Sequence, residues 1–143
     1  MDIELLRADQ TSIKVDAIVN PSSSLLQNGL PPGSAIVGGG NLLCRFVIHA
    51  VVPRIGEGDE DRKLRDATRA ALQRAEELAV ASVAIPAMGT GVFGFPVERS
   101  ARIMLAAAID FRAQARSLSR VVFCLFGATP YEEFSRILQE LGG

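Results

Sequence analysis

One loop constrains this chain of 143 residues more than any other feature, because it separates a short apolar run from an amphipathic one. The apolar run ends at Ile85, the amphipathic run begins at Pro96, and the segment between them contains three glycines. A strand, a glycine-rich loop and a helix start together present several backbone N–H groups to one anion. Because Phe93 also lies in the loop, we expect the anion to be attached to an organic body, as in a nucleotide.

Composition narrows the class of protein. The chain has 15 Lys and Arg residues against 16 Asp and Glu residues, so no excess of positive charge favours binding to nucleic acid. With 48% hydrophobic and 22% charged residues, residues 1–143 are expected to form one globular domain. Cys44 and Cys124 lie in apolar runs, which favours buried thiols in a reducing compartment. No run resembles a signal peptide or reaches the length of a membrane span, so we expect a cytoplasmic location.

Apolar periodicity predicts a strand-rich first half and alternating helices and strands in the second half. Strands are predicted at residues 3–7, 15–20, 34–37, 44–52, 82–86 and 120–126, and a turn is predicted at residues 38–41. Helices are predicted at residues 60–79, 97–115 and, after an N-cap at Thr129, up to residue 141. The pattern indicates an α/β fold, a three-layer α/β/α sandwich on a mixed sheet of about five or six strands. Ligands of such sheets bind beyond the carboxyl ends of the strands, so the segments after Asn20, Ile85 and Phe126 are expected to line one crevice.

Four segments of the chain, in order and at compatible spacing, resemble the macrodomain family. Residues 15–20 match the family's Val-Asp-Ala-Ile-Val-Asn residue for residue, and residues 8–11 resemble its Gly-Asp-Ile-Thr. Residues 41–51 are similar to the family's fourth strand. Residues 85–96 are similar to its phosphate loop, usually Ala-Ile-Ser-Thr-Gly-Ile-Tyr-Gly-Phe-Pro. The family typically binds ADP-ribose, and several of its branches hydrolyse ADP-ribosyl or O-acetyl-ADP-ribose bonds.

The resemblance implies a role for each matched position. Asp9 would accept a hydrogen bond from the adenine amino group, the Gln10 backbone would touch the same base, and Phe126 would stack on it. The diphosphate would be held by the backbone of Gly89, Thr90, Gly91, Val92 and Phe93. Phe93 would also pack on the distal ribose. The expected ligand is therefore ADP-ribose, either free or attached to an ADP-ribosylated protein, and no cofactor is expected.

The chain departs from the family after Asn20, where Pro21-Ser22-Ser23 replaces the usual Ala-Ala-Asn. The second Asn of the family meets the distal ribose, so Ser22 or Ser23 would take its place with a shorter reach. The family's glycine-rich first loop is also shortened, and two alignments compete. Either residues 34–36 are a remnant of that loop, or residues 33–37 are the third strand and the loop is deleted with its helices. We prefer the deletion; in both alignments the Asp that the hydrolytic branch uses in catalysis is missing.

Each candidate residue also has a purely structural interpretation. The glycine loop would be a βα turn, Asp9 a cap, Asn20 and the serines turn residues, and Phe126 part of the core. His49, the single histidine, is expected to be packed in the core, which disfavours a metal site or a His-based triad. Three hypotheses remain: a non-catalytic ADP-ribose-binding module, which we favour, a hydrolase of ADP-ribosyl or O-acetyl-ADP-ribose bonds, and an interaction domain whose pocket has decayed. No catalytic residue is predicted.

Overall fold

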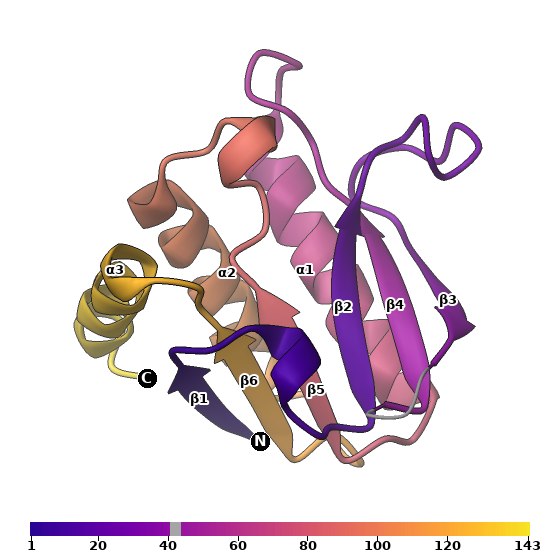
Figure 1. The fold of residues 1–143 in the computed structure, drawn as a ribbon, viewed down its shortest axis with the longest axis vertical. Helices are drawn as coiled ribbons and strands as arrows, with labels where there is room; N and C mark the ends of the chain where they lie inside the picture. Colours follow the sequence, from indigo (N-terminus) through magenta and orange to yellow (C-terminus); the bar gives the residue numbers. More distant parts are fainter. Residues whose placement is uncertain (41–43) are drawn as a thin grey trace.

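Six strands lie side by side in the order β1-β6-β5-β2-β4-β3 in the computed structural model, which describes residues 1–40 and 44–143 (Figure 1). All neighbouring strands are parallel except β3, which runs antiparallel to β4. The segments that follow β1, β6, β5 and β2 therefore meet at one edge of the sheet. Every candidate site residue of the sequence lies at or near that edge.

The element bounds are as follows. The strands are β1 (Asp2–Leu6), β2 (Ala17–Ser22), β3 (Ala35–Gly39), β4 (Phe46–Val51), β5 (Ser82–Pro86) and β6 (Arg120–Cys124). The helices are η1 (Gln10–Ser12) and η2 (Gly91–Phe93), both 3-10, and α1 (Glu60–Glu77), α2 (Val97–Phe111) and α3 (Ala128–Glu140). None of the described helices is both long enough and apolar enough to cross a membrane.

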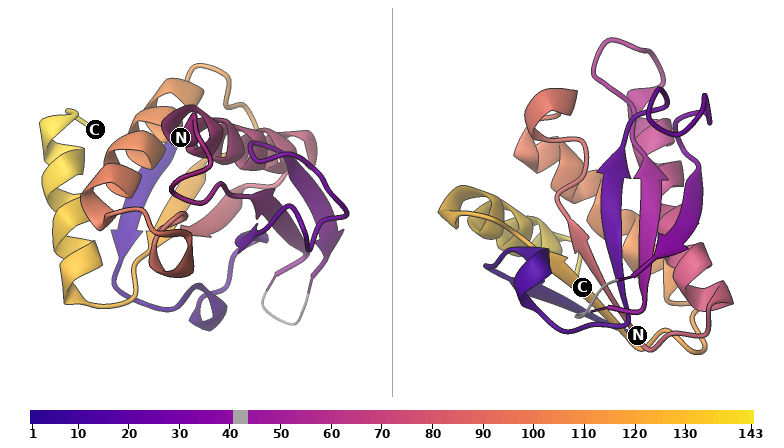
Figure 2. Two further views of the ribbon diagram at one scale, coloured as in Figure 1. Left: turned by 90° about the horizontal axis from the view of Figure 1, so that it is seen from above. Right: turned by 45° about the vertical axis from the view of Figure 1, so that its right-hand side comes forward.

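The three α-helices lie on one face of the sheet (Figure 2). α1 packs against β3 and β4, α2 lies between α1 and α3, and α3 contacts β1. Alternate strand residues, among them Val19, Ile48 and Phe123, point to this side and are fully buried against Leu64 of α1 and Leu105 of α2. This layer is the main hydrophobic core of the protein, and it fixes the positions of the strand ends.

The opposite face of the sheet is covered by the segment between β1 and β2, in which η1 crosses in front of β5 (Figure 1). Beneath it lies a smaller apolar cluster that includes Val15, Ile18, Ala84, Val122 and Cys124. Burial raises the pKa of the Cys124 thiol to about 11, so this thiol stays protonated at neutral pH. The α/β fold with a mixed sheet is confirmed; the layer on this face contains a 3-10 helix and, among the described residues, no α-helix.

Asp16 of the matched segment 15–20 has a structural task. Its carboxylate accepts hydrogen bonds from the backbone N–H groups of Ala81 (2.8 Å) and Ser82 (3.2 Å). In return, the backbone N–H of Asp16 donates a hydrogen bond to Ser82 Oγ (3.0 Å). These contacts set the starts of β2 and β5 level, so that their carboxyl ends reach the same edge.

Two details of the predicted elements are wrong. Gly38 and Gly39, which the sequence predicts as a turn, belong to β3. A Cβ on Gly38 would lie 3.0 Å from His49 Nε2, so this glycine permits a close approach within the sheet. Asn41, the last residue of that predicted turn, lies outside the described residues. The N-cap of α3 is Gly127, with φ 107°, and not Thr129, because this glycine lets the chain turn directly from β6 into the helix.

Candidate functional site

The glycine loop between β5 and α2 is held by its carbonyl groups. The buried Ser100 hydroxyl of α2 donates to Met88 O (2.7 Å), and Phe95 N donates to Gly89 O (2.8 Å). In a planar trans peptide the N–H points away from the C=O, so the amide of Thr90 faces away from Phe95. The rest of the protein therefore binds the carbonyl oxygens of the loop, and the N–H groups of the loop point away from it.

Three successive amides of this loop have no hydrogen-bond acceptor among the residues that the structure describes. Among the described residues, nothing accepts a hydrogen bond from the N–H groups of Thr90, Gly91 or Val92, which open the 3-10 helix η2. Gly91 has φ 65° and open space where a Cβ would stand. Such a row of unpaired, outward N–H groups forms a concavity suited to an anion such as a diphosphate.

The conformation of the loop requires glycine at its first position. Gly89 has φ 85°, in the left-handed region, and a Cβ there would lie 2.9 Å from Cδ1 of the Phe95 ring. Phe95 is 3% exposed, so it cannot give way. Any side chain at position 89 would therefore have to displace this ring, and the group that Gly89 itself offers to an anion is its backbone.

Asp9 follows β1 and caps η1. Its Oδ1 accepts hydrogen bonds from Thr11 N and Thr11 Oγ1, both at 2.9 Å. These bonds hold the pKa of the Asp9 carboxyl below its ordinary value, so it is ionised at neutral pH. Oδ2 accepts no hydrogen bond from the described residues, which leaves it available for a donor such as an exocyclic amino group. The cap interpretation and the binding prediction are compatible.

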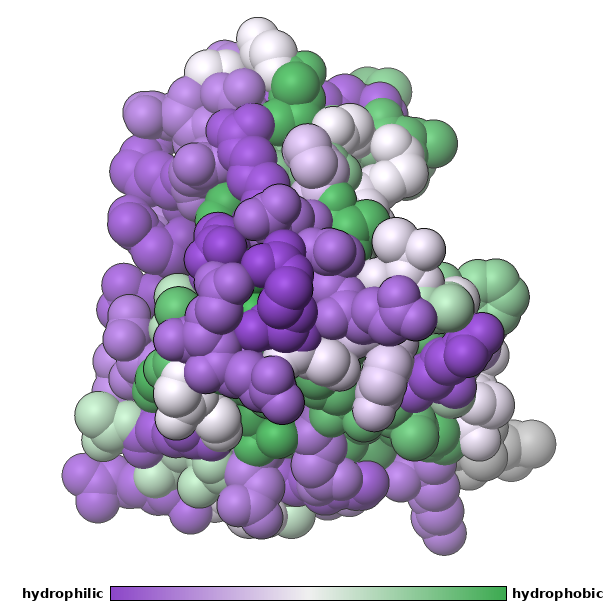
Figure 3. Space-filling model, turned by 90° about the vertical axis from the view of Figure 1, so that its left-hand side faces the viewer, coloured by the Kyte–Doolittle hydropathy of each residue, from purple (hydrophilic) through white to green (hydrophobic). Residues whose placement is uncertain are grey.

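Phe126 follows β6 and stands in solvent. Its side chain is 82% exposed, so it is not part of the core. With Arg7, Ala8, Asp9 and Gly127 it lines a hollow of about 290 Å³. Figure 3 shows the molecule from the left-hand side of Figure 1, and its outline in that view is indented on the right. An exposed aromatic ring beside an acceptor-only carboxylate is suited to stack a purine and read its amino group.

Gln10, the neighbour of Asp9, has a feature that sequence analysis did not foresee. Its side-chain Oε1 is buried, and no described residue donates a hydrogen bond to it. The predicted contact of the Gln10 backbone with a base remains a prediction.

The distal candidates lie at the end of β2. Asn20 Nδ2 and His49 Nδ1 are 3.2 Å apart across the β2–β4 pairing, and both side chains lie at the surface or half-buried. Ser22 is 4% exposed and accepts a hydrogen bond from Gln27 Nε2 (3.0 Å). Their predicted contact with a distal ribose remains a prediction, and His49 is bonded at the edge of the core rather than enclosed in it.

Ser23 begins a connection without any helix. Its Oγ accepts from Leu26 N (3.2 Å), and residues 24–29 form turns before the chain reaches β3. Leu25 is 90% exposed and Leu26 is 75% exposed. Because Ala35–Gly39 pairs with β4, this segment is the third strand, as the preferred alignment predicts. The connection between β2 and β3 is correspondingly short.

The strand order sets the candidates in a line. Asp9 and Phe126 follow the neighbouring strands β1 and β6, the glycine loop follows β5, and Asn20 with the serines stands at β2. Neighbouring strands are about 4.8 Å apart, so these groups are spread over three steps along one edge. Along this edge, an aromatic ring and a carboxylate come first, the backbone amides of the glycine loop follow, and small polar side chains come last.

Sequence reasoning missed the segment after β4. Arg54 Nη1 donates to Val92 O (3.0 Å), its guanidinium carbon lies 5.2 Å from the centre of the Phe93 ring, and Ile55 N donates to Phe93 O (2.9 Å). This segment therefore contacts η2 through the carbonyl oxygens of Val92 and Phe93. The sequence could have indicated it, because residues 54 and 55 directly follow a predicted strand, and the carboxyl end of that strand reaches the same edge of the sheet.

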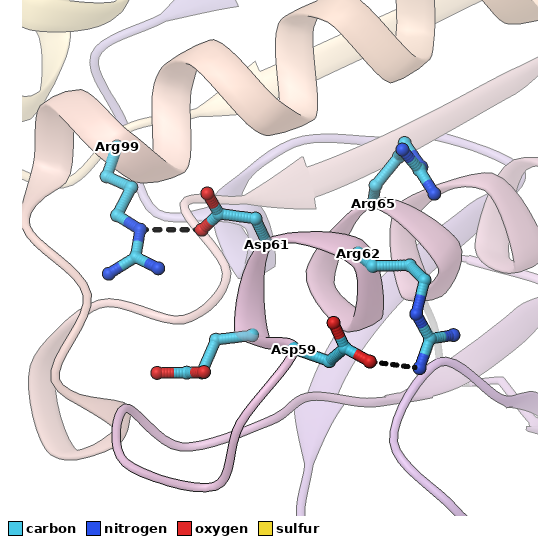
Figure 4. A pocket seen from close by; sticks show the side chains of 6 residues that line it. Asp59, Asp61, Arg62, Arg65 and Arg99 are labelled. Carbon is cyan, nitrogen blue, oxygen red and sulfur yellow. Dashed lines mark hydrogen bonds and ion pairs between the residues drawn. The ribbon is translucent and has the colours of Figure 1, made fainter.

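A second hollow, of about 440 Å³, lies at the N-termini of α1 and α2 (Figure 4). It is lined by Asp59, Glu60, Asp61, Arg62, Arg65 and Arg99. Two ion pairs lie within it: Arg99 Nε lies 2.6 Å from Asp61 Oδ1, and Arg62 Nη2 lies 3.2 Å from Asp59 Oδ2. With three acids and three arginines, the lining of this hollow has no net charge to attract an ionic ligand.

Known proteins are similar to this chain over almost all of its length. A family model described as Macro domain matches residues 16–104. A macro domain-containing protein of Caldanaerobacter subterraneus subsp. tengcongensis is 35% identical, over 97% of this chain and 97% of that protein. The alignment is 170 residues long, whereas the chain has 143, so the relative contains residues that have no counterpart here.

Solved structures give the same assignment. The Oceanobacillus iheyensis macrodomain with ADP is similar with a TM-score of 0.89 and 25% identity, over 97% of this chain and 90% of that one. The Trypanosoma brucei macrodomain in complex with ADP-ribose has a TM-score of 0.83 and 26% identity, over 94% of this chain and 68% of that one. Sequence motifs, strand order and these similarities agree, and the chain belongs to the macrodomain family.

Proposed function

We propose that this chain is a non-catalytic module that binds ADP-ribose or a closely related nucleotide diphosphate. The observation that carries the proposal is the row of outward, unpaired amides at Thr90, Gly91 and Val92. A diphosphate there is flanked on one side by Phe126 and Asp9, which suit an adenine. Solved macrodomains that resemble this chain contain ADP and ADP-ribose, which supports the same ligand class.

The biological form of the ligand follows from the short connection after β2. Within the described residues, no helix lies between β2 and β3. The end of the site at Asn20, Ser22 and Ser23, where the distal ribose would bind, is therefore less enclosed than it would be with a longer loop. We infer that an ADP-ribose unit attached to a protein is accepted as well as the free ligand. The buried thiols fit a reducing compartment, and we place the protein in the cytoplasm. No cofactor takes part in this function.

Isothermal titration calorimetry with ADP-ribose, ADP, AMP and ATP tests the proposal. We expect ADP-ribose and ADP to bind more tightly than AMP, because AMP lacks the second phosphate that the loop amides would receive. An ADP-ribosylated peptide should bind within about threefold of free ADP-ribose, a difference of less than 1 kcal/mol. Absence of heat and of competition at millimolar ADP-ribose would exclude the function.

A further inference from the structure

The two phenylalanines of the glycine loop each lie under an arginine, but the two arginines differ in charge balance. Arg54 covers Phe93 at 5.2 Å and Arg99 covers Phe95 at 5.1 Å. Arg99 is also paired with Asp61 at 2.6 Å, which neutralises it. Within the described parts of the chain, no carboxylate forms an ion pair with Arg54. A full positive charge is therefore left beside Phe93 alone.

The hydrogen bond of Arg54 sets the direction of one peptide. Arg54 Nη1 donates to Val92 O at 3.0 Å, and the neighbouring Ile55 N donates to Phe93 O at 2.9 Å. Because the N–H of a peptide points away from its C=O, the N–H of Phe93 is turned away from Arg54. This N–H belongs to the i→i+3 bonding of the 3-10 helix η2, so Arg54 holds the short helix at whose start the free amides of Thr90, Gly91 and Val92 lie.

Among the residues that the structure describes, Arg54 is the positively charged residue that contacts residues 89–93. Backbone amides carry only partial charges, whereas a diphosphate carries full ones. A charge placed behind the loop, within about one Debye length (8 Å) of the amides, contributes attraction that salt reduces only in part. It does so without occupying the space that the ligand needs.

We propose that Arg54 is a positioning residue that makes the loop selective for a diphosphate. It fixes the direction of the Val92–Phe93 peptide and so holds the 3-10 helix η2, at whose start the free amides lie, holds the Phe93 ring, and supplies the charge that balances the anion. The inference rests on the proposed function, and it goes further by assigning the selectivity between phosphorylated and unphosphorylated adenosine ligands to a residue outside the glycine loop.

Three variants test it: Arg54→Met, Arg54→Lys and, as a matched control, Arg99→Met, which also removes an arginine from a phenylalanine of the loop. Affinities for ADP-ribose, ADP and adenosine are measured by calorimetry or by ligand-observed NMR, at two salt concentrations. Arg54→Met should weaken ADP-ribose and ADP about tenfold and leave adenosine unchanged, since one charge-assisted contact is lost. Arg54→Lys should recover most of the loss, because it keeps the charge and a donor for Val92 O.

The controls separate positioning from general support of the fold. Arg99→Met should change the affinity for ADP-ribose by less than about twofold, because that charge is already neutralised. The affinity of Arg54→Met for ADP-ribose should depend less on salt than that of the unmodified chain. An equal loss for ADP-ribose and adenosine, or no loss at all, would overturn the inference while leaving the proposed function intact. Failure of the unmodified chain to bind ADP-ribose would overturn both.

Discussion

The glycine loop and the segment from Asn20 to Ser34 extend from the neighbouring strands β5 and β2, but the first presents backbone groups and the second presents side chains. The loop offers backbone amides whose directions are fixed by bonds to Met88 O and Gly89 O. The other segment offers side chains that already take part in hydrogen bonds within the protein, such as Ser22 with Gln27 and Ser23 with Leu26 N. A backbone site tolerates change in almost every side chain except glycine, whereas a side-chain site changes with each substitution. We therefore expect binding energy to be concentrated at the loop.

The sharpest test of this comparison is Gly91→Val. Gly91 has φ 65°, and a β-branched residue there is strained and stands in the open space before the amides. The affinity for ADP-ribose should fall at least about a hundredfold, because contacts to a charged group are each worth about 1.5–3 kcal/mol. Calorimetry measures the affinity, and circular dichroism verifies the fold.

The matched control for this variant is Gly142→Val. Gly142 also has a left-handed φ, of 73°, with open space around it, but it follows α3 at the end of the chain. Its replacement should lower the melting temperature by a similar amount and leave the affinity unchanged. If both variants lose affinity equally, strain and not the amide row explains the result, and the contrast between the two regions disappears.

Phe126→Ala should have the next largest effect. Stacking of a base on an aromatic side chain is worth about 1–3 kcal/mol by alanine substitution, so ADP-ribose should bind about tenfold more weakly or worse. Because Phe126 is 82% exposed, the melting temperature should stay the same. Phe126→Leu keeps an apolar side chain without the flat ring and should resemble the alanine variant. If the leucine variant keeps full affinity, Phe126 contributes only apolar contact with the base and no stacking.

The parts of the candidate site differ in how well they can be predicted from the sequence. The amide row was predicted because its information is local: glycines, a preceding strand and a following helix within about fifteen residues of sequence. The pairing of Asp9 with Phe126 needed the strand order, which the resemblance supplied. Arg54 was missed because it meets Val92 only through the tertiary fold, 38 positions further along the chain. Nothing in the composition of residues 54–59 marks one arginine among 13 as part of a site.

The burial of Ser22 was not predictable for a related reason. A serine in a loop of serines and prolines suggests a solvated turn. In the fold, Ser22 belongs to β2 and is covered by its bond with Gln27, which itself follows from the local turn of residues 23–30. Where the chain has lost a segment that relatives retain, local composition gives little information about what takes its place.

Asp9→Asn tests whether the carboxylate reads a base or only caps η1. An Asn keeps an oxygen for Thr11 and turns an amide N–H₂ outward, where it opposes the adenine amino group and favours the carbonyl of hypoxanthine. ADP-ribose should bind about tenfold more weakly, and the hypoxanthine analogue should bind better than to the unmodified chain. The cap is retained, so stability should hardly change. Equal losses for both bases would show that Asp9 acts through structure alone.

Ser23→Ala should have the smallest effect, and it tests the other side of the comparison directly. Ser23 stands where the resemblance places the family's second Asn, but its Oγ already accepts a hydrogen bond from Leu26 N at 3.2 Å. ADP-ribose should lose less than about threefold in affinity, and ADP, which has no distal ribose, should lose nothing. Ser23→Asn restores the longer side chain and should strengthen ADP-ribose but not ADP. A loss above tenfold for ADP-ribose alone in the alanine variant would place much of the binding energy in side chains of the shortened segment.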